Sequence, residues 1–110
     1  MLLMKKRFFD AVRSGAKTTT LRYWRRCMVR PGRVRTVPGL GKVHIDSAEP
    51  VDPSDLTENH ARADGFESVG ALLEALNALY PPAGREGRKL YLVRFTYLPG
   101  ADGPAPRRRR

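Results

Sequence analysis

The sequence predicts a small α+β domain, because its apolar residues follow a helical spacing in two segments and alternate along a third. The helical spacing occurs near the N-terminus and again at residues 69–79, and the alternation occurs at residues 89–98. The chain has 110 residues, of which 41% are hydrophobic. This length and composition are typical of a domain with one globular core, and they exclude an enzyme built from two such domains. Short strands with helices at the N-terminus and in the middle favour a small, partly closed β-barrel with about three helices.

The first helix is expected from about residue 3 to Ser14. Apolar residues recur at i, i+4 and i+8 from Met4 to Val12 and form one stripe. Gly15 predicts the end of this helix, because a residue without a Cβ adopts the left-handed conformation in which many helices terminate. The β-branched run within residues 17–23 then disfavours a helix and predicts a strand.

Three further strands are expected from turn signals and from alternation. Pro-Gly pairs precede residues 33–37 and, with one intervening Leu-Gly pair, residues 42–46, and each of these runs predicts a short strand. Residues 89–98 are apolar on nearly both faces of a strand, with only Arg94 and Thr96 as polar exceptions after Lys89. A strand that is apolar on both faces is expected in the middle of the sheet.

Two helices are expected between the third and the last strand. Ser54 or Asp55 can cap a short helix over about residues 56–63. Ser68 can cap a longer helix that ends near Leu79, since the two prolines that follow cannot continue it.

Positive charge is concentrated in the first part of the chain. The 21 Lys and Arg exceed the 11 Asp and Glu by ten, and residues 1–42 hold 12 of these bases against the single acid Asp10. Residues 99–110 lack apolar periodicity and end in four arginines, which predicts a disordered Arg-rich tail after a domain of residues 1–98. The charge therefore indicates a local basic cleft in the first part of the domain, suited to a phosphate-bearing ligand.

The cysteine, histidine and hydropathy patterns predict an intracellular protein without a metal site or a membrane-spanning segment. Cys27 is the only cysteine, and with His44 and His60 it forms no spacing typical of a zinc site, so we expect no metal and no cofactor. Lys5 interrupts the apolar run of residues 1–4, and no later stretch approaches 18 uncharged apolar residues. We therefore expect a cytoplasmic protein with no membrane partner and, by default, a monomer.

The segment from Gly15 to Arg22 carries the strongest chemical signal. It places a lysine, three threonines and an arginine directly after the expected helix end. In a regular strand Thr20 and Arg22 share one face while Lys17 points to the other. Lys17 can therefore meet Thr20 only if the chain is still turning between them, as a loop after Gly15 would allow.

The same segment begins a series of landmarks that continues along the chain. The series comprises Gly-x-Lys-Thr-x-Thr-x-Arg at 15–22, a Pro-Gly turn before a basic strand, Leu-Thr-Glu at 56–58, Ala-Asp-Gly-Phe at 63–66, an amphipathic helix ending in Tyr80-Pro81, and a strand with Tyr91, Val93 and Phe95. In this order, from about Phe8 to Leu98, the chain resembles the ASCH domain family. The resemblance implies a PUA-like β-barrel of mixed strands with helices packed around it and a cleft lined by residues 17–22.

The resemblance also implies a ligand and an alternative activity. The ASCH family is generally proposed to bind RNA or modified nucleosides, and some small members hydrolyse N4-acetylcytidine with a lysine, a threonine and a glutamate. Motif matching places these catalytic residues at Lys17, Thr20 and Asp64, the last one methylene shorter than glutamate. The residues expected to bind RNA or a nucleoside are Lys17, Thr18, Thr20, Arg22, Tyr23, Trp24 and Arg25.

The aromatic pair in this set has two interpretations. Tyr23 and Trp24 lie beside Arg25, and such a cluster can stack a base and hold its phosphate. The alternative is core packing, which we expect for the ring that shares a strand face with Leu21.

Two hydrolytic mechanisms are consistent with the predicted catalytic residues. In the first, neighbouring cations lower the pKa of Lys17, which takes the proton of Thr20 so that the hydroxyl attacks an acyl carbon. In the second, Asp64 activates water and Lys17 stabilises the oxyanion.

A ribonuclease is a further alternative, because a cationic site can stabilise a phosphorane, although the motif contains no histidine pair. The last alternative is a protein-interaction module, which would bind a basic partner through the acidic second half of the chain.

Overall fold

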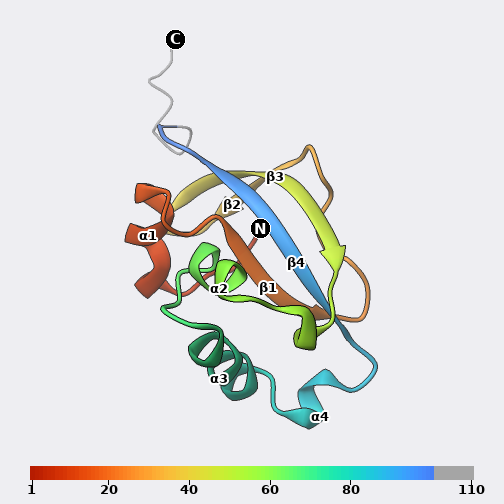
Figure 1. The fold of residues 1–110 in the computed structure, drawn as a ribbon. Coiled ribbons are helices and arrows are strands. Elements are labelled where there is room, and N and C mark those ends of the chain that lie inside the picture. Colours follow the sequence, from red (N-terminus) through yellow and green to blue (C-terminus); the bar gives the residue numbers. More distant parts are fainter. Residues whose placement is uncertain (101–110) are drawn as a thin grey trace.

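Strand β4 (Lys89–Leu98) is the centre of the fold in the computed structural model, which describes residues 1–100 (Figure 1). It pairs antiparallel with β1 (Thr19–Trp24) on one side and with β3 (Gly41–Pro50) on the other. Strand β2 (Val34–Val37) pairs antiparallel with β3, which gives the order β1-β4-β3-β2. The prediction that residues 89–98 lie in the middle of the sheet is confirmed.

The central position of β4 follows from its apolar residues, which are buried on both faces. Leu90 and Leu92 belong to one buried cluster, whereas Val93 and Phe95 belong to a second cluster on the opposite face. Each of these four side chains is at most 2% exposed. Full burial of such a side chain stabilises a fold by about 1.5–3 kcal/mol, so both faces of β4 favour the interior.

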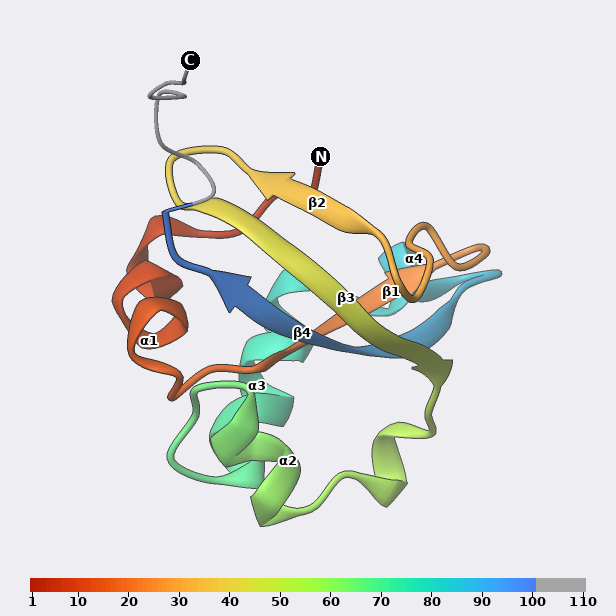
Figure 2. The same cartoon turned by 90° about the horizontal axis from the view of Figure 1, so that it is seen from above.

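The sheet is open, which corrects the expectation of a barrel with mixed strands. Within residues 1–100 all strand pairs are antiparallel, and the edge strands β1 and β2 do not pair. The N-terminal segment lies between these edges instead: the Leu2 N–H donates to the Thr36 carbonyl at 2.8 Å, and Arg22 donates to the Leu3 carbonyl at 2.5 Å. Figure 2 shows the N-terminus beside β2. Leu2 and Leu3 thus bridge the two edges, through one backbone hydrogen bond to β2 and one hydrogen bond from the Arg22 side chain of β1.

Helix α1 (Phe9–Ser14) begins later than the predicted residue 3, after a 3₁₀ turn at Lys6–Phe8. The reason is that the Leu2 N–H and the Leu3 carbonyl are hydrogen-bonded to β2 and to the Arg22 side chain, and not within a helix. The predicted end is confirmed, since Gly15 has φ +84° and its N–H donates to the Val12 carbonyl.

The other two main helices lie against the face of the sheet that buries Leu90 and Leu92 (Figure 1). Helix α2 (Glu58–Ala63) is capped by Thr57, because the predicted caps Ser54 and Asp55 belong to a separate 3₁₀ turn (Pro53–Asp55). Helix α3 (Val69–Leu79) has the predicted start, with the Ser68 side chain accepting from the Ala71 N–H, and the predicted end. A short helix α4 (Pro82–Arg85) follows. No helix in residues 1–100 has the length and apolar character needed to cross a membrane.

The predicted Arg-rich tail, residues 99–110, falls almost entirely outside the described residues. Only Pro99 and Gly100 are described, and they form a turn after β4. The α+β class is confirmed, and the single sheet with helices against it explains how one short chain builds two apolar clusters.

Candidate functional site

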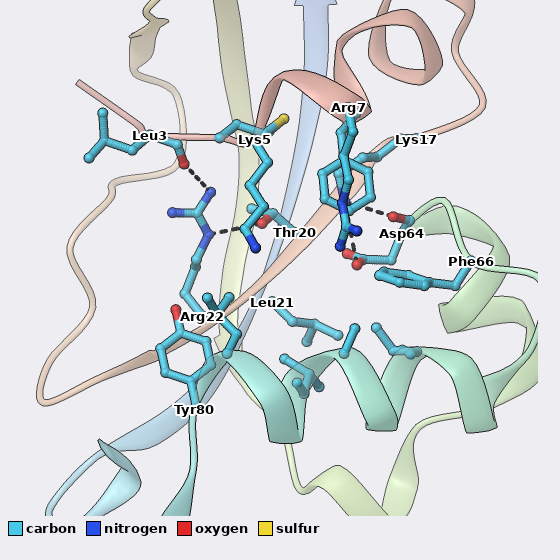
Figure 3. A pocket seen from close by; sticks show the side chains of 16 residues that line it. Leu3, Lys5, Arg7, Lys17, Thr20, Leu21, Arg22, Asp64, Phe66 and Tyr80 are labelled. Carbon is cyan, nitrogen blue, oxygen red and sulfur yellow. Dashed lines mark hydrogen bonds and ion pairs between the residues drawn. The ribbon is translucent and has the colours of Figure 1, made fainter.

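A pocket of about 410 Å³ opens beside the edge strand β1, between the N-terminal segment and α3 (Figure 3). Its floor is apolar and comes from β1 and α3, through Leu21, Leu72, Ala75, Leu76 and Leu79. Three aromatic side chains also line it: Phe8, Phe66 and Tyr80. Among residues 1–100, β1 has no strand partner on this side, so the space next to it is open to a ligand.

An ion pair of Lys17 and Asp64 forms the polar end of this pocket. The two residues are only 3% and 5% exposed. Lys17 Nζ donates to the Asp64 backbone carbonyl at 2.7 Å and lies 3.4 Å from its carboxylate Oδ2. The second carboxylate oxygen, Oδ1, accepts from the Thr19 hydroxyl at 3.1 Å. A buried charge needs such partners, because desolvation alone would exclude it from the interior.

Backbone contacts between distant segments bring Lys17 and Asp64 together. After the end of α1, the Lys17 N–H donates to the Ala11 carbonyl and the Thr18 N–H donates to the Ala63 carbonyl at 2.8 Å. Asp64 is the residue that ends α2, so the chain entering β1 is attached to the C-terminus of that helix. The loop that the sequence required for Lys17 to meet Thr20 is present at residues 15–18, but it directs Lys17 to Asp64, while Thr20 bonds to Arg22.

The Phe8 ring completes the environment of Lys17. Lys17 Nζ lies 4.6 Å from the centre of this ring, and the Arg7 guanidinium lies 4.8 Å from it. The Phe66 ring packs edge-on against Phe8 with 5.8 Å between ring centres. The aromatic face therefore stabilises two cations, one buried and one exposed.

The buried pair has pKa values shifted toward the neutral forms. Burial lowers the pKa of Lys17, and the attraction of Asp64 offsets only part of that effect. Burial likewise raises the pKa of Asp64 above 3.8, against the opposing effects of Lys17 and of the Thr19 hydrogen bond. A lysine and a carboxyl group shifted in these directions can exchange a proton more easily than the same groups in water.

A second polar pair, Thr20 and Arg22, lies farther along β1 and also lines the pocket. Arg22 Nε donates to the Thr20 hydroxyl oxygen at 2.9 Å, as their position on one strand face allows. The same guanidinium holds the Leu3 carbonyl, and burial lowers the pKa of Arg22. Because the Thr20 oxygen accepts from arginine, its own O–H hydrogen is available to a ligand.

The cations that line the pocket outnumber the acids four to one. Lys5 and Arg7 are exposed, and their side chains extend from the N-terminal segment over the pocket (Figure 3). Together with Lys17 and Arg22 they face the single acid Asp64. Within residues 1–100, no group of three or more His, Cys, Asp or Glu side chains is placed to hold a metal ion. The excess positive charge favours an anionic or electron-rich ligand.

The predicted catalytic residues Lys17, Thr20 and Asp64 all line this pocket, but only two of them are bonded to each other. Lys17 contacts Asp64, whereas Thr20 bonds to Arg22 and its neighbour Thr19 bonds to Asp64. The alternation of a strand explains this arrangement, because Thr19 and Thr20 must point to opposite faces.

Four residues of the predicted binding set are not among the residues that line the pocket: Thr18, Tyr23, Trp24 and Arg25. Tyr23 is buried in the core with its ring 5.2 Å from Tyr80, as expected for the ring that shares a face with Leu21. Trp24 packs against Tyr91, and both Thr18 and Arg25 are exposed.

The residues missed from the sequence come mainly from the N-terminal segment and from the turn after α2. Besides the apolar floor they include Leu3, Met4, Lys5, Arg7, Phe8 and Phe66, and Tyr80 at the end of α3. The helical spacing placed Phe8 on the apolar stripe of a helix, and that periodicity gave no sign that the segment before it would bridge the two sheet edges. Only the clustering of basic residues at 5–7 indicated a charged surface there.

Three solved structures have the same fold as this small α+β domain with its basic pocket. The hypothetical protein PH0355 matches with a TM-score of 0.74 and 13% identity, over 87% of this chain and 95% of its own. The ASCH domain from Lactobacillus crispatus JV V101 matches with a TM-score of 0.68 and 18% identity, over 80% of this chain and 68% of its own. Protein EF3133 from Enterococcus faecalis V583 matches with a TM-score of 0.62 and 16% identity, over 82% of this chain and 69% of its own.

The chain therefore has an ASCH-like fold, as the sequence resemblance implied. No family model matches the sequence, and no curated protein does. At these low identities the structural likeness concerns the fold, so the function has to be argued from the residues of the pocket.

Proposed function

We propose that the pocket binds a nucleoside, either free or as part of RNA. The observation that carries this proposal is the combination of an apolar, aromatic-lined floor with hydrogen-bonding groups and excess positive charge. A volume of about 410 Å³ lies in the range of small-ligand pockets. A nucleobase has the matching chemistry, because its faces are apolar and its edge carries donors and acceptors.

Each group of the pocket has a role in this proposal. The base lies over Leu21 and Leu76 and beside the aromatic rings. The free O–H hydrogen of Thr20 donates to an acceptor on the base edge, and Arg22 fixes the orientation of that hydroxyl. The exposed Lys5 and Arg7 attract the phosphate of a nucleotide at the pocket entrance. The ASCH-like fold supports the same ligand class through the resemblance.

Calorimetric titration with the four common nucleosides and N4-acetylcytidine tests this function. Arg22→Ala is expected to weaken binding of the best nucleoside at least tenfold, because the hydroxyl of Thr20 loses its orientation and the pocket loses a cation. The matched control is Arg62→Ala, which removes an exposed arginine from α2 outside the pocket. Absence of nucleoside binding by the unmodified protein, or equal losses in the two variants, would contradict the proposal.

The second candidate function is hydrolysis of N4-acetylcytidine, favoured by the buried Lys17–Asp64 pair. Its shifted pKa values suit proton transfer, and it lies in the same pocket as Thr20. Among the described residues Lys17 is bonded to Asp64 and not to Thr20, which favours water activation by Asp64 over attack by Thr20. The Asp64 carboxylate takes a proton from water as the water oxygen bonds to the acyl carbon, and the Lys17 ammonium stabilises the oxyanion. As the C–N bond breaks, the protonated Asp64 returns that proton to N4, so that cytidine leaves as the neutral amine. The acetic acid that remains loses its proton to the solvent as acetate.

Chromatographic detection of cytidine after incubation with N4-acetylcytidine tests the hydrolase. Turnover is expected to fall at least a hundredfold in Asp64→Asn, which cannot accept the proton, and much less in Thr20→Val. The reverse order of the two effects would identify Thr20 as the nucleophile. Circular dichroism of both variants verifies that they remain folded.

A further inference from the structure

A second hollow, of about 380 Å³, lies where the loop between β1 and β2 meets strand β2. Its lining is polar and includes three arginines, Arg30, Arg33 and Arg35. The loop belongs to a long stretch without acids, since no Asp or Glu occurs between Asp10 and Asp46. The nucleoside pocket shares none of these residues, so the hollow is a separate feature.

The arginines of this hollow have no acidic partner within residues 1–100. Arg30 and Arg33 are exposed, and neither forms an ion pair with any described residue. On the neighbouring strand β3, the Ile45 N–H donates to the Arg33 carbonyl, and the residue after Ile45 is the acid Asp46. The Asp46 carboxylate is already engaged, 2.7 Å from both the Thr96 hydroxyl and His44 Nδ1. Like charges gathered without a counter-ion attract an external anion.

Arg35 connects the hollow to the N-terminal segment. Its guanidinium donates to the Met28 carbonyl at 3.2 Å and to the Met1 carbonyl at 3.1 Å. Two residues farther on, the Leu3 carbonyl accepts from Arg22 of the nucleoside pocket. Two residues of chain span at most about 7 Å, so this short segment connects an arginine of the hollow to an arginine of the pocket.

We propose that the hollow binds the phosphodiester backbone of a single-stranded RNA whose nucleobase occupies the nucleoside pocket. The inference rests on the proposed function and adds that the physiological ligand is a polynucleotide and not a free nucleoside. A single strand presents successive phosphates beside its bases, which matches a cationic hollow next to a base-sized pocket. Met28 and Val34, about half exposed at the hollow, offer apolar contact to a flanking base.

Fluorescence anisotropy with a labelled eight-nucleotide RNA of mixed sequence tests this site. In the full chain, Arg30→Ala/Arg33→Ala is compared with Arg62→Ala/Arg88→Ala, which removes two exposed arginines elsewhere. Arg35 is kept in both variants because it holds two backbone carbonyls. The first variant is expected to bind the RNA at least tenfold more weakly and to reduce the salt-dependence slope by about 1.4, that is, about 0.7 for each of two phosphates. The control variant is expected to change affinity less than about threefold.

The outcomes separate this site from the nucleoside pocket. Nucleoside affinity is expected to stay within twofold in Arg30→Ala/Arg33→Ala, since neither arginine lines the pocket. Equal RNA losses in the two double variants, or no loss in either, would overturn the proposal. It would also be overturned if the first variant lost affinity for phosphatidylserine vesicles but kept its affinity for RNA, because the hollow would then be a membrane site. RNA binding that depends on Arg30 and Arg33, without any nucleoside binding, would support the hollow and reject the proposed function.

Discussion

The two basic regions of this domain, the nucleoside pocket and the second hollow, differ in the burial and in the partners of their cations. In the nucleoside pocket, Lys17 is 3% exposed and has a carboxylate, a backbone carbonyl and an aromatic ring as partners. At the second hollow, Arg30 and Arg33 are exposed and have no acidic partner within residues 1–100. Burial therefore holds a cation in one geometry, which suits selection of a ligand or catalysis. Exposed cations provide attraction that depends on salt and tolerates many sequences.

The largest effect that this comparison predicts is on stability, from Asp64→Ala. The variant leaves the Lys17 ammonium without its carboxylate and the Thr19 hydroxyl without its acceptor, although Lys17 keeps the backbone carbonyl at position 64. We expect the free energy of unfolding to fall by about 3 kcal/mol, the low end of the range for a broken buried pair. Urea denaturation measures it.

Glu49→Ala is the control for that prediction. Glu49 pairs with Arg94 at 2.9 Å, but both side chains are about half exposed, so we expect a loss below about 1 kcal/mol. If the free energy of unfolding falls no more in Asp64→Ala than in Glu49→Ala, the buried Lys17–Asp64 pair does not stabilise the fold more than an exposed pair.

The next effect is expected on the pKa of Asp64 when the Lys17 side chain is replaced by methionine. The ammonium of Lys17 favours the charged carboxylate and so lowers its pKa, while burial raises it. Lys17→Met keeps an apolar stem near Phe8 but removes the charge, so the pKa of Asp64 is expected to rise further above 3.8. Carbon-detected NMR of the carboxyl group against pH measures the change. An unchanged or lower pKa would mean that Lys17 exerts no attraction on this group.

A still smaller effect is expected from Phe8→Leu, which removes the ring that faces two cations. The contacts with Lys17 and Arg7 are each worth about 0.5–2 kcal/mol according to their exposure, and a leucine retains much of the apolar contact. We expect a loss of about 1 kcal/mol in the free energy of unfolding and a several-fold weaker affinity for nucleosides. Val34→Ala, which truncates a half-exposed side chain at the hollow, should leave nucleoside affinity unchanged. Loss of affinity in that control would show that the two regions are not independent.

The smallest effect is expected from deletion of the four terminal arginines, Arg107–Arg110. These residues add four positive charges to the chain, whereas the groups named for the nucleoside pocket come from residues 3–80. Nucleoside affinity should change less than about twofold, in contrast to the loss in Arg22→Ala, while RNA affinity falls in a salt-dependent way for every sequence. A nucleoside affinity that fell as much as in Arg22→Ala would mean that bulk charge governs binding.

Local patterns in the sequence predicted those elements whose signals are local. Ser68 starts α3 and Gly15 ends α1, because a cap and a left-handed residue act within one helical turn. The bounds of β4 were also predicted, since its two apolar faces require a central position. The Thr20–Arg22 hydrogen bond likewise follows from their shared strand face.

The remaining features depend on contacts between distant segments, which no local pattern encodes. The pairing of Lys17 with Asp64 requires the Thr18–Ala63 backbone bond, and the open sheet requires Leu2 to bond across to β2. Motif matching did place Lys17 and Asp64 in one site, but the assignment of Thr19 to the carboxylate could not be made without the turn that precedes β1.

Methyl NMR of the isotope-labelled protein during titration with the best-binding nucleoside tests whether the nucleoside occupies the pocket beside β1. A ligand in the nucleoside pocket should shift the methyl signals of Leu21, Leu72 and Leu76, which line its floor. Val43 and Val93, buried in the other apolar cluster, should remain unchanged. Shifts confined to the pocket leucines are the predicted result. A nucleoside that binds without shifting them, or that shifts both clusters equally, would contradict the assignment of this pocket as the nucleoside site.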